Sequence, residues 1–101
     1  MRKPSASYRE GLLQDLRHPA EAAAYLNAAL EEGSQEGFLV ALRDVAEANG
    51  MSGLARRTKL NRENLYRMLS KEGNPQLTSL TTLLETMGLK LAVEVGDPVP
   101  A

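Results

Sequence analysis

The chain has 101 residues, 43% hydrophobic and 25% charged, which predicts a single globular domain over residues 1–101. It has no cysteine, so disulfides, thiolate metal sites and cysteine nucleophiles are excluded, and a reducing, cytoplasmic location is expected. No stretch supplies the ~18 apolar residues of a membrane helix, so we expect no membrane partner. Aromatic residues make up only 4%, while Ala, Leu and Glu are plentiful, which favours a mainly all-α fold.

Stop signals divide the first half of the chain into three predicted helices. The first covers about residues 8–17, where leucines are spaced three and four apart, and it ends before Pro19. Pro19 suits the first turn of a second helix, which runs until Gly33. Ser34 is the expected N-cap of the third helix, and Gly50 closes it in the left-handed conformation.

From Met51 onward the predicted helices are shorter. Ser52 is the expected cap of a helix that runs to about Thr58, and Asn61 is the expected cap of a helix from Arg62 to Ser70. Two short helices joined by about three residues have the layout of a helix-turn-helix. We therefore expect a compact bundle of about six short helices that contains this motif.

The last predicted elements occupy residues 72–95. The Asn74–Pro75 pair supplies the cap and first turn of a helix that Gly88 ends. From Leu89 the apolar period changes from 3.6 to 2, which predicts one C-terminal β-strand, followed by a tail over residues 96–101. A lone strand must pair with a second copy, a partner protein or an unrecognised edge, and we expect a homodimer. The predicted dimerisation residues are Leu89, Leu91, Val93 and Val95.

The net charge of −1 conceals an uneven distribution of charge along the chain. Residues 1–50 hold five Lys or Arg against eight Asp or Glu, and residues 72–101 hold one against four, so each part carries −3. Residues 51–71 hold six basic residues against Glu63 alone, a net charge of +5. A basic segment can be no more than a solvated face. Because this one coincides with the predicted helix-turn-helix, we interpret it as a surface for double-stranded DNA.

Apolar residues of segment 51–71 define the buried side of its two helices, and the small Ala55 permits close approach where they cross. On the solvent side, an Arg can bind guanine bidentately and Asn61 can read adenine, while other basic residues contact phosphates. A free helix N-terminus also favours a phosphate. Tyr66 either contacts DNA or packs beside the core. The predicted DNA-binding residues are Ser52, Arg56, Arg57, Lys59, Asn61, Arg62, Glu63, Tyr66, Arg67 and Lys71.

The stretch from Ala41 to Val93 resembles the addiction-module antidote proteins of the HigA-like group, and the upstream EAAAYLNAALEEG matches their N-terminal pattern. The most specific elements are ALRDVA, LYR, GNP and GL. The resemblance implies a fold similar to Cro/C1-type helix-turn-helix repressors. It also implies an antitoxin of a type II toxin–antitoxin module that neutralises a RelE/HigB-type ribonuclease toxin and represses its own operon at a palindromic operator.

One residue departs from the pattern of that family. Lys59 stands in the turn where such proteins commonly have glycine. If Lys59 adopts a positive φ, the conformation costs about 1 kcal/mol relative to glycine. This departure bears on the geometry of the turn more than on the fold.

The acidic N-terminal half, residues 1–50, is the predicted toxin-facing region, since its charge complements a basic partner. The same helices can equally form a lid on the core, and composition does not decide between these interpretations. The predicted toxin-contact residues are Tyr8, Leu12, Tyr25 and Leu26.

Catalysis and metal binding are the weakest interpretations. His18 has no second His or Cys to complete a metal site, and Glu31, Glu32 and Glu36 have the character of a solvated helix end. No nucleophile, base and oxyanion donor can be assembled, so we expect a non-enzymatic protein without metal or cofactor. Two alternatives to the antitoxin remain, namely a stand-alone phage-type helix-turn-helix repressor without a toxin and a helical protein-interaction module.

Overall fold

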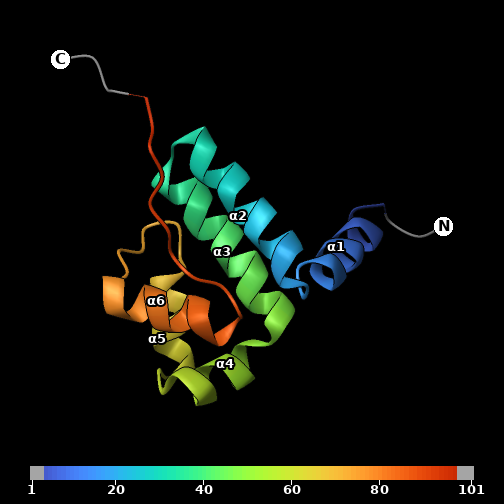
Figure 1. Cartoon of the computed structure of the whole chain (residues 1–101). Helices are drawn as coiled ribbons and strands as arrows, with labels where there is room; N and C mark the ends of the chain where they lie inside the picture. The colour runs from blue at the N-terminus through green and yellow to red at the C-terminus, as the bar shows by residue number, and fades with distance from the viewer. Residues whose placement is uncertain (1–3, 98–101) are drawn as a thin grey trace.

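The computed structural model describes residues 4–97, and the regular elements of this range are six α-helices (Figure 1). This confirms the mainly all-α prediction. Predicted tail residues 98–101 lie outside the described part. The helices are α1 (Pro4–Asp15), α2 (Pro19–Glu32), α3 (Gln35–Asn49), α4 (Met51–Thr58), α5 (Arg62–Met68) and α6 (Leu77–Thr86).

Helices α2 and α3 lie side by side as a hairpin (Figure 1). Pro19 occupies the first turn of α2, as predicted. Gly33 has φ +85°, and its N–H donates to the Leu30 carbonyl at 3.1 Å, so the left-handed turn ends α2. The Ser34 hydroxyl accepts from the Gly37 N–H at 2.9 Å and caps α3. These local signals fix the corner between the two longest helices.

Helix α1 packs against α3, near the end of the hairpin where α2 begins (Figure 1). It starts at Pro4, four residues before the predicted residue 8, because proline suits a first helical turn. It ends at Asp15, before Pro19, as the proline predicted. Leu16, just beyond the helix, is buried and anchors it to the core.

The start of α4 differs from the prediction. Gly50, with φ +89°, is both the last cap of α3 and the first cap of α4, and no side chain caps α4. Ser52 lies inside the first turn, so its prediction as an N-cap is wrong. The reversal takes place at the glycine, which leaves no extended residue between the helices for a serine to occupy.

Two other helix ends are shifted. Helix α5 ends at Met68 rather than at Ser70, because residues 69–72 form a turn. Helix α6 begins at Leu77 with Gln76 as its N-cap, rather than at the Asn74–Pro75 pair. Gly88, with φ +82°, follows the end of α6, as predicted.

The C-terminal β-strand prediction is wrong. Residues 89–97 have no regular secondary structure, and the segment runs back along α2 (Figure 1). The Leu89 N–H donates to the Leu84 carbonyl at 2.8 Å, which ties the start of the segment to α6. Val93 and Val95 are fully exposed. The alternating pattern identifies an extended backbone, but a strand also needs a paired edge, which residues 4–97 do not supply.

A single hydrophobic core joins the hairpin to the three C-terminal helices. Helix α4 contacts α3, α5 and α6, so it links the hairpin to the last two helices. None of the helices within residues 4–97 is long and apolar enough to cross a bilayer. The least exposed large side chains are Leu39, Leu42, Leu54, Leu65, Leu69, Leu83 and Val45.

Candidate nucleic-acid interface

Helices α4 and α5 are joined by residues 59–61, the three-residue connection that the sequence predicts. Lys59 has φ +62° and ψ +16°, the left-handed conformation, and it is the one non-glycine residue with positive φ within residues 4–97. The turn therefore adopts the geometry that glycine favours with a lysine in its place. Segment 51–71 is called the helix-turn-helix segment below.

A buried hydroxyl closes this turn from inside. Thr58 is 8% exposed, and its Oγ1 donates to the Leu54 carbonyl at 2.6 Å. The same oxygen accepts from the Leu60 N–H at 3.3 Å, so one side chain bonds both α4 and the turn. This supplies a partner for the backbone N–H of Leu60, which lies in the turn beyond α4.

Apolar contacts set the orientation of α5. Leu54, Leu65 and Leu69 are almost completely buried. Ala55, Leu60 and Met68 are partly buried and pack against the same cluster. The prediction that the apolar residues of the helix-turn-helix segment are buried is confirmed. Because these residues face the core, the opposite side of α5 faces solvent.

The exposed side of α5 carries Arg62, Glu63, Asn64 and Arg67. Asn61 is exposed as well, and its Oδ1 accepts from the Asn64 N–H at 2.7 Å, so it caps α5 as predicted. Its amide nitrogen remains for another partner. Among the ten predicted DNA-binding residues, Tyr66 alone is half buried, whereas the exposed ones are Ser52, Arg56, Arg57, Lys59, Asn61, Arg62, Glu63, Arg67 and Lys71.

Two guanidinium groups lie over the ring of Tyr66. The Cζ of Arg62, one turn earlier on α5, is 5.7 Å from the ring centroid. The Cζ of Arg43, on α3, is 5.4 Å from it. Both distances fall within the range of cation–π attraction. Arg43 lies outside the helix-turn-helix segment, and sequence reasoning did not assign it to the site.

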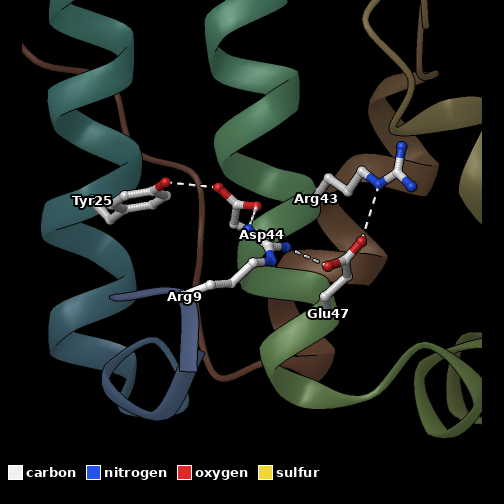
Figure 2. A network of polar contacts seen from close by, with 5 residues as sticks. All are labelled: Arg9, Tyr25, Arg43, Asp44 and Glu47. Carbon is white, nitrogen blue, oxygen red and sulfur yellow. Dashed lines mark hydrogen bonds and ion pairs between the residues drawn. The ribbon is translucent and has the colours of Figure 1, made fainter. Parts of the chain in front are cut away.

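Arg43 belongs to a polar network that joins three helices (Figure 2). Its Nε donates to Glu47 Oε1 at 3.1 Å, within α3. Arg9 of α1 donates to the other oxygen of Glu47 and, at 3.2 Å, to Asp44. These bonds, to Glu47 first and Asp44 second, raise the pKa of Arg9 above its ordinary value. The spacing of four residues between Arg43 and Glu47 could have predicted this ion pair from the sequence, because such residues are neighbours on one side of a helix.

Tyr25 of α2 completes the network. Its hydroxyl donates to Asp44 Oδ2 at 2.7 Å (Figure 2). Burial of the phenol, followed by the bond to Asp44, raises the pKa of Tyr25 to about 12. The neutral phenol is the form that donates to the carboxylate, so this contact holds over the whole physiological pH range.

The chain leaves α5 through a close turn. The Gly73 N–H donates to the Ser70 carbonyl at 2.8 Å, and the Gly73 carbonyl accepts from Gln35 Nε2 at 3.2 Å. A Cβ atom at position 73 would overlap the carbonyl oxygen of Met68, the last residue of α5. Glycine is therefore required here by a close backbone approach rather than by positive φ.

The residues predicted to contact a toxin differ in their exposure. Tyr8 is 73% exposed, whereas Leu12 and Tyr25 are half buried. Leu26 is 5% exposed and belongs to the core, which corrects its assignment to a surface. Its position on the inner side of α2 was visible in the helical spacing, since Leu26 falls one turn after the equally buried Ala22.

A groove of about 470 Å³ lies between the C-terminal segment and α2. Leu26 and Leu30 line one side of it, Phe38 of α3 contributes as well, and residues 89–92 and Glu94 form the other side. Of the predicted dimerisation residues, Leu89 is partly buried against the core, whereas Leu91, Val93 and Val95 are exposed.

His18 and the three glutamates considered for a metal site are exposed. Within residues 4–97 no three His, Asp or Glu side chains gather closely enough to hold a metal ion. The described residues offer instead a cationic surface on α4 and α5, which Arg43 of α3 contacts at Tyr66.

Comparison with known proteins supports the resemblance to addiction-module antidote proteins, without specifying the HigA-like group. Residues 11–95 match the family described as probable addiction module antidote protein. A protein of Haemophilus influenzae, described as uncharacterized, is 36% identical over 81 residues, which cover 80% of this chain and 84% of that protein. No solved structure matches.

Proposed function

The chain belongs to the family of probable addiction module antidote proteins, and we propose that it is the antitoxin of a type II toxin–antitoxin module. In this proposal it binds double-stranded DNA through α4 and α5, represses its own operon, and neutralises a RelE/HigB-type ribonuclease toxin. Family membership supports a toxin partner in general. The DNA-binding activity is our inference from the residues, whereas the class of toxin is what the resemblance to the HigA-like group implies.

The observation that carries the DNA-binding proposal is the exposure of all six basic residues of the helix-turn-helix segment. Their charges face solvent, whereas the leucines of the same helices are buried. In this arrangement α5 is the recognition helix. Arg62 and Arg67 reach base edges in the major groove, and the basic residues of α4 and the turn contact phosphates.

A homodimer is the form in which such a motif reads a palindromic operator, since two recognition helices then enter successive major grooves about 34 Å apart. The exposed Leu91, Val93 and Val95 support a dimer, because three apolar side chains on one short segment favour burial against a second copy. The contact proposed here is apolar packing and does not require a β-strand.

The toxin-binding surface is proposed for the exposed side of α1 and α2. Tyr8 is an exposed aromatic residue in a half of the chain that carries a net charge of −3. An aromatic side chain within an acidic surface suits a basic partner, because opposite charges steer association and the ring supplies apolar contact.

The DNA-binding proposal is tested by in vitro selection from a library of random DNA duplexes, followed by titration of the selected duplex at several salt concentrations. We expect a palindromic consensus and an affinity that falls steeply with salt. The double variant Arg62→Ala/Arg67→Ala should no longer enrich the consensus sequence. The matched control Arg17→Ala/Lys90→Ala removes two exposed positive charges elsewhere and should still enrich it. A wild-type protein that enriches no sequence would reject the proposal.

The toxin proposal is tested separately with the product of the reading frame next to this gene. We expect the two proteins to co-purify and the complex to lack ribonuclease activity that the toxin alone possesses. If no such reading frame exists while DNA selection succeeds, the stand-alone repressor is the correct function. If a partner binds with no salt dependence and no DNA is selected, the chain is a protein-interaction module.

A further inference from the structure

A residue outside the helix-turn-helix segment contributes to its surface. Arg43 lies on α3, and its side chain is 45% exposed. Its guanidinium lies over the ring of Tyr66, 5.4 Å from the centroid, so α3 and the recognition helix meet at this point. Sequence position alone would place Arg43 in the acidic half of the chain.

The guanidinium of Arg43 is held in place from one side. Its Nε donates to Glu47 Oε1, and Glu47 is in turn bonded to Arg9 (Figure 2). A planar guanidinium that is fixed at its Nε can present a constant face to an aromatic ring, which a lysine ammonium cannot do. The network therefore sets the orientation of the group that lies over Tyr66.

The phenol of Tyr66 is available for an external partner. Its ring is half buried, and no hydrogen bond joins its hydroxyl to another group of residues 8–97, the range in which side chains are described. No polar side-chain atom in that range is buried without a partner, so the hydroxyl is open to solvent. A tyrosine has only two side-chain torsions, so contacts that fix its ring also fix the direction of its hydroxyl.

We propose that Arg43 is a positioning residue for DNA recognition, which holds the Tyr66 ring so that its phenol faces one base pair and so sets the preference at that position. This inference rests on the proposed function and adds a specificity determinant that lies outside the helix-turn-helix segment. A cation–π contact at an exposed site corresponds to a change in base preference of roughly two- to fivefold.

The experiment is in vitro selection from the random duplex library with the wild-type protein and with Tyr66→Ala, Arg43→Ala and Arg43→Lys. We expect Tyr66→Ala and Arg43→Ala to lose preference at the same base position. Arg43→Lys should lose that preference too, although it keeps the charge and hence the salt dependence of binding. In Tyr66→Ala protein the further change Arg43→Ala should have no additional effect, since the two residues act as a unit.

Three results would overturn the proposal. The first is a consensus for Arg43→Ala that is unchanged or altered at a position other than that of Tyr66→Ala. The second is a full recovery of preference in Arg43→Lys, which would assign the effect to charge. The third is an equal loss on all duplexes with a salt slope reduced by about one, which would make Arg43 a phosphate contact.

A measurement on the free protein separates positioning from misfolding. The aromatic NMR signals of Tyr66 should shift in Arg43→Lys, whereas the melting temperature and the signals of buried leucines should remain. Unmoved Tyr66 signals would refute the positioning role whatever the DNA result. Failure of the proposed function is a different outcome, since the wild-type protein itself would then select no sequence, and the inference about Arg43 would fail with it.

Discussion

The hydroxyl of Thr58 lies 3.3 Å from the N–H of Leu60 and 2.6 Å from the carbonyl of Leu54, so one buried side chain joins α4 to the turn before the recognition helix. We expect Thr58→Val, which keeps the shape and removes the hydroxyl, to lower the free energy of unfolding by about 1 kcal/mol, because the Leu60 N–H loses its partner. Thr58→Ser keeps the hydroxyl and is the control. Urea unfolding of both variants measures the difference, and equal losses would show that the methyl group matters more than the bond.

Lys59 holds a left-handed conformation without the freedom of glycine. We expect Lys59→Gly to raise the free energy of unfolding by about 1 kcal/mol, because the strain of a side chain at positive φ is removed. The control is Lys71→Gly, which removes the same charge from a turn residue whose φ is not positive and should not stabilise the protein. Thermal unfolding of the two variants checks this, and an increase in both would assign the effect to charge.

Arg67 and Arg57 should differ in their effects on DNA binding. Arg67 lies on the exposed side of α5, so Arg67→Ala should weaken binding to the selected duplex by about 1–3 kcal/mol and relax preference at one base pair. Arg57 lies on α4, so Arg57→Ala should weaken binding to all duplexes alike and reduce the salt slope by about one. Fluorescence anisotropy on matched and mismatched duplexes distinguishes them. A uniform loss for Arg67→Ala would make it a phosphate contact.

The raised pKa of Tyr25 predicts that the free energy of unfolding decreases at high pH. The folded chain holds the phenolic proton more tightly than the unfolded chain, whose pKa is the ordinary 10.0. The stabilisation is therefore complete below pH 10 and is lost as the pH rises from 10 to about 12. Tyr25→Phe should lack this part of the pH dependence, which urea unfolding across alkaline pH measures. An absorbance titration should also lose its latest phenolate step. Identical profiles would show that burial of the phenol and its bond to Asp44 do not raise the pKa of Tyr25 in the folded chain.

The exposed valines of the C-terminal segment provide a test of the dimer. Val93 and Val95 are fully exposed, so Val93→Asp/Val95→Asp should leave the fold intact and produce a monomer in sedimentation experiments. Affinity for the palindromic duplex should fall with it, since one recognition helix then binds alone. The matched control Glu94→Gln/Asp97→Asn changes charge on the same segment. A double aspartate variant that remains dimeric would place the interface elsewhere.

Local signals account for most of the fold. Pro19, Gly33, Ser34 and Asn61 each act within a few residues, and the structure confirms all four. The prediction of Ser52 as an N-cap was wrong because Gly50 caps both α3 and α4. A sequence signal for one helix end does not show that the same residue also caps the next helix. The prediction of a strand over residues 89–95 was wrong. The alternation of apolar and polar residues indicates which side chains share a face, but a strand also requires a neighbouring strand, which the pattern does not identify.

The site was predictable only in part, for the same reason. The exposure of Arg62 and Arg67 follows from the spacing of the apolar residues Leu65, Met68 and Leu69. The meeting of Arg43 with Tyr66 depends instead on how α3 packs against the recognition helix, and periodicity within one helix carries no information about that contact. Leu26 is the opposite case, since its burial was predictable from the sequence. Its helical spacing indicated a buried position, and its assignment to a toxin-binding surface did not take this into account.

The close turn at Gly73 limits how this scaffold can be redesigned. A library built on the proposed DNA-binding surface can vary the solvent-facing positions of α5, but position 73 must be held constant, because any added carbon would push against the Met68 carbonyl. Position 73 therefore belongs to the fixed framework, and the variable positions are those of α5 that face solvent.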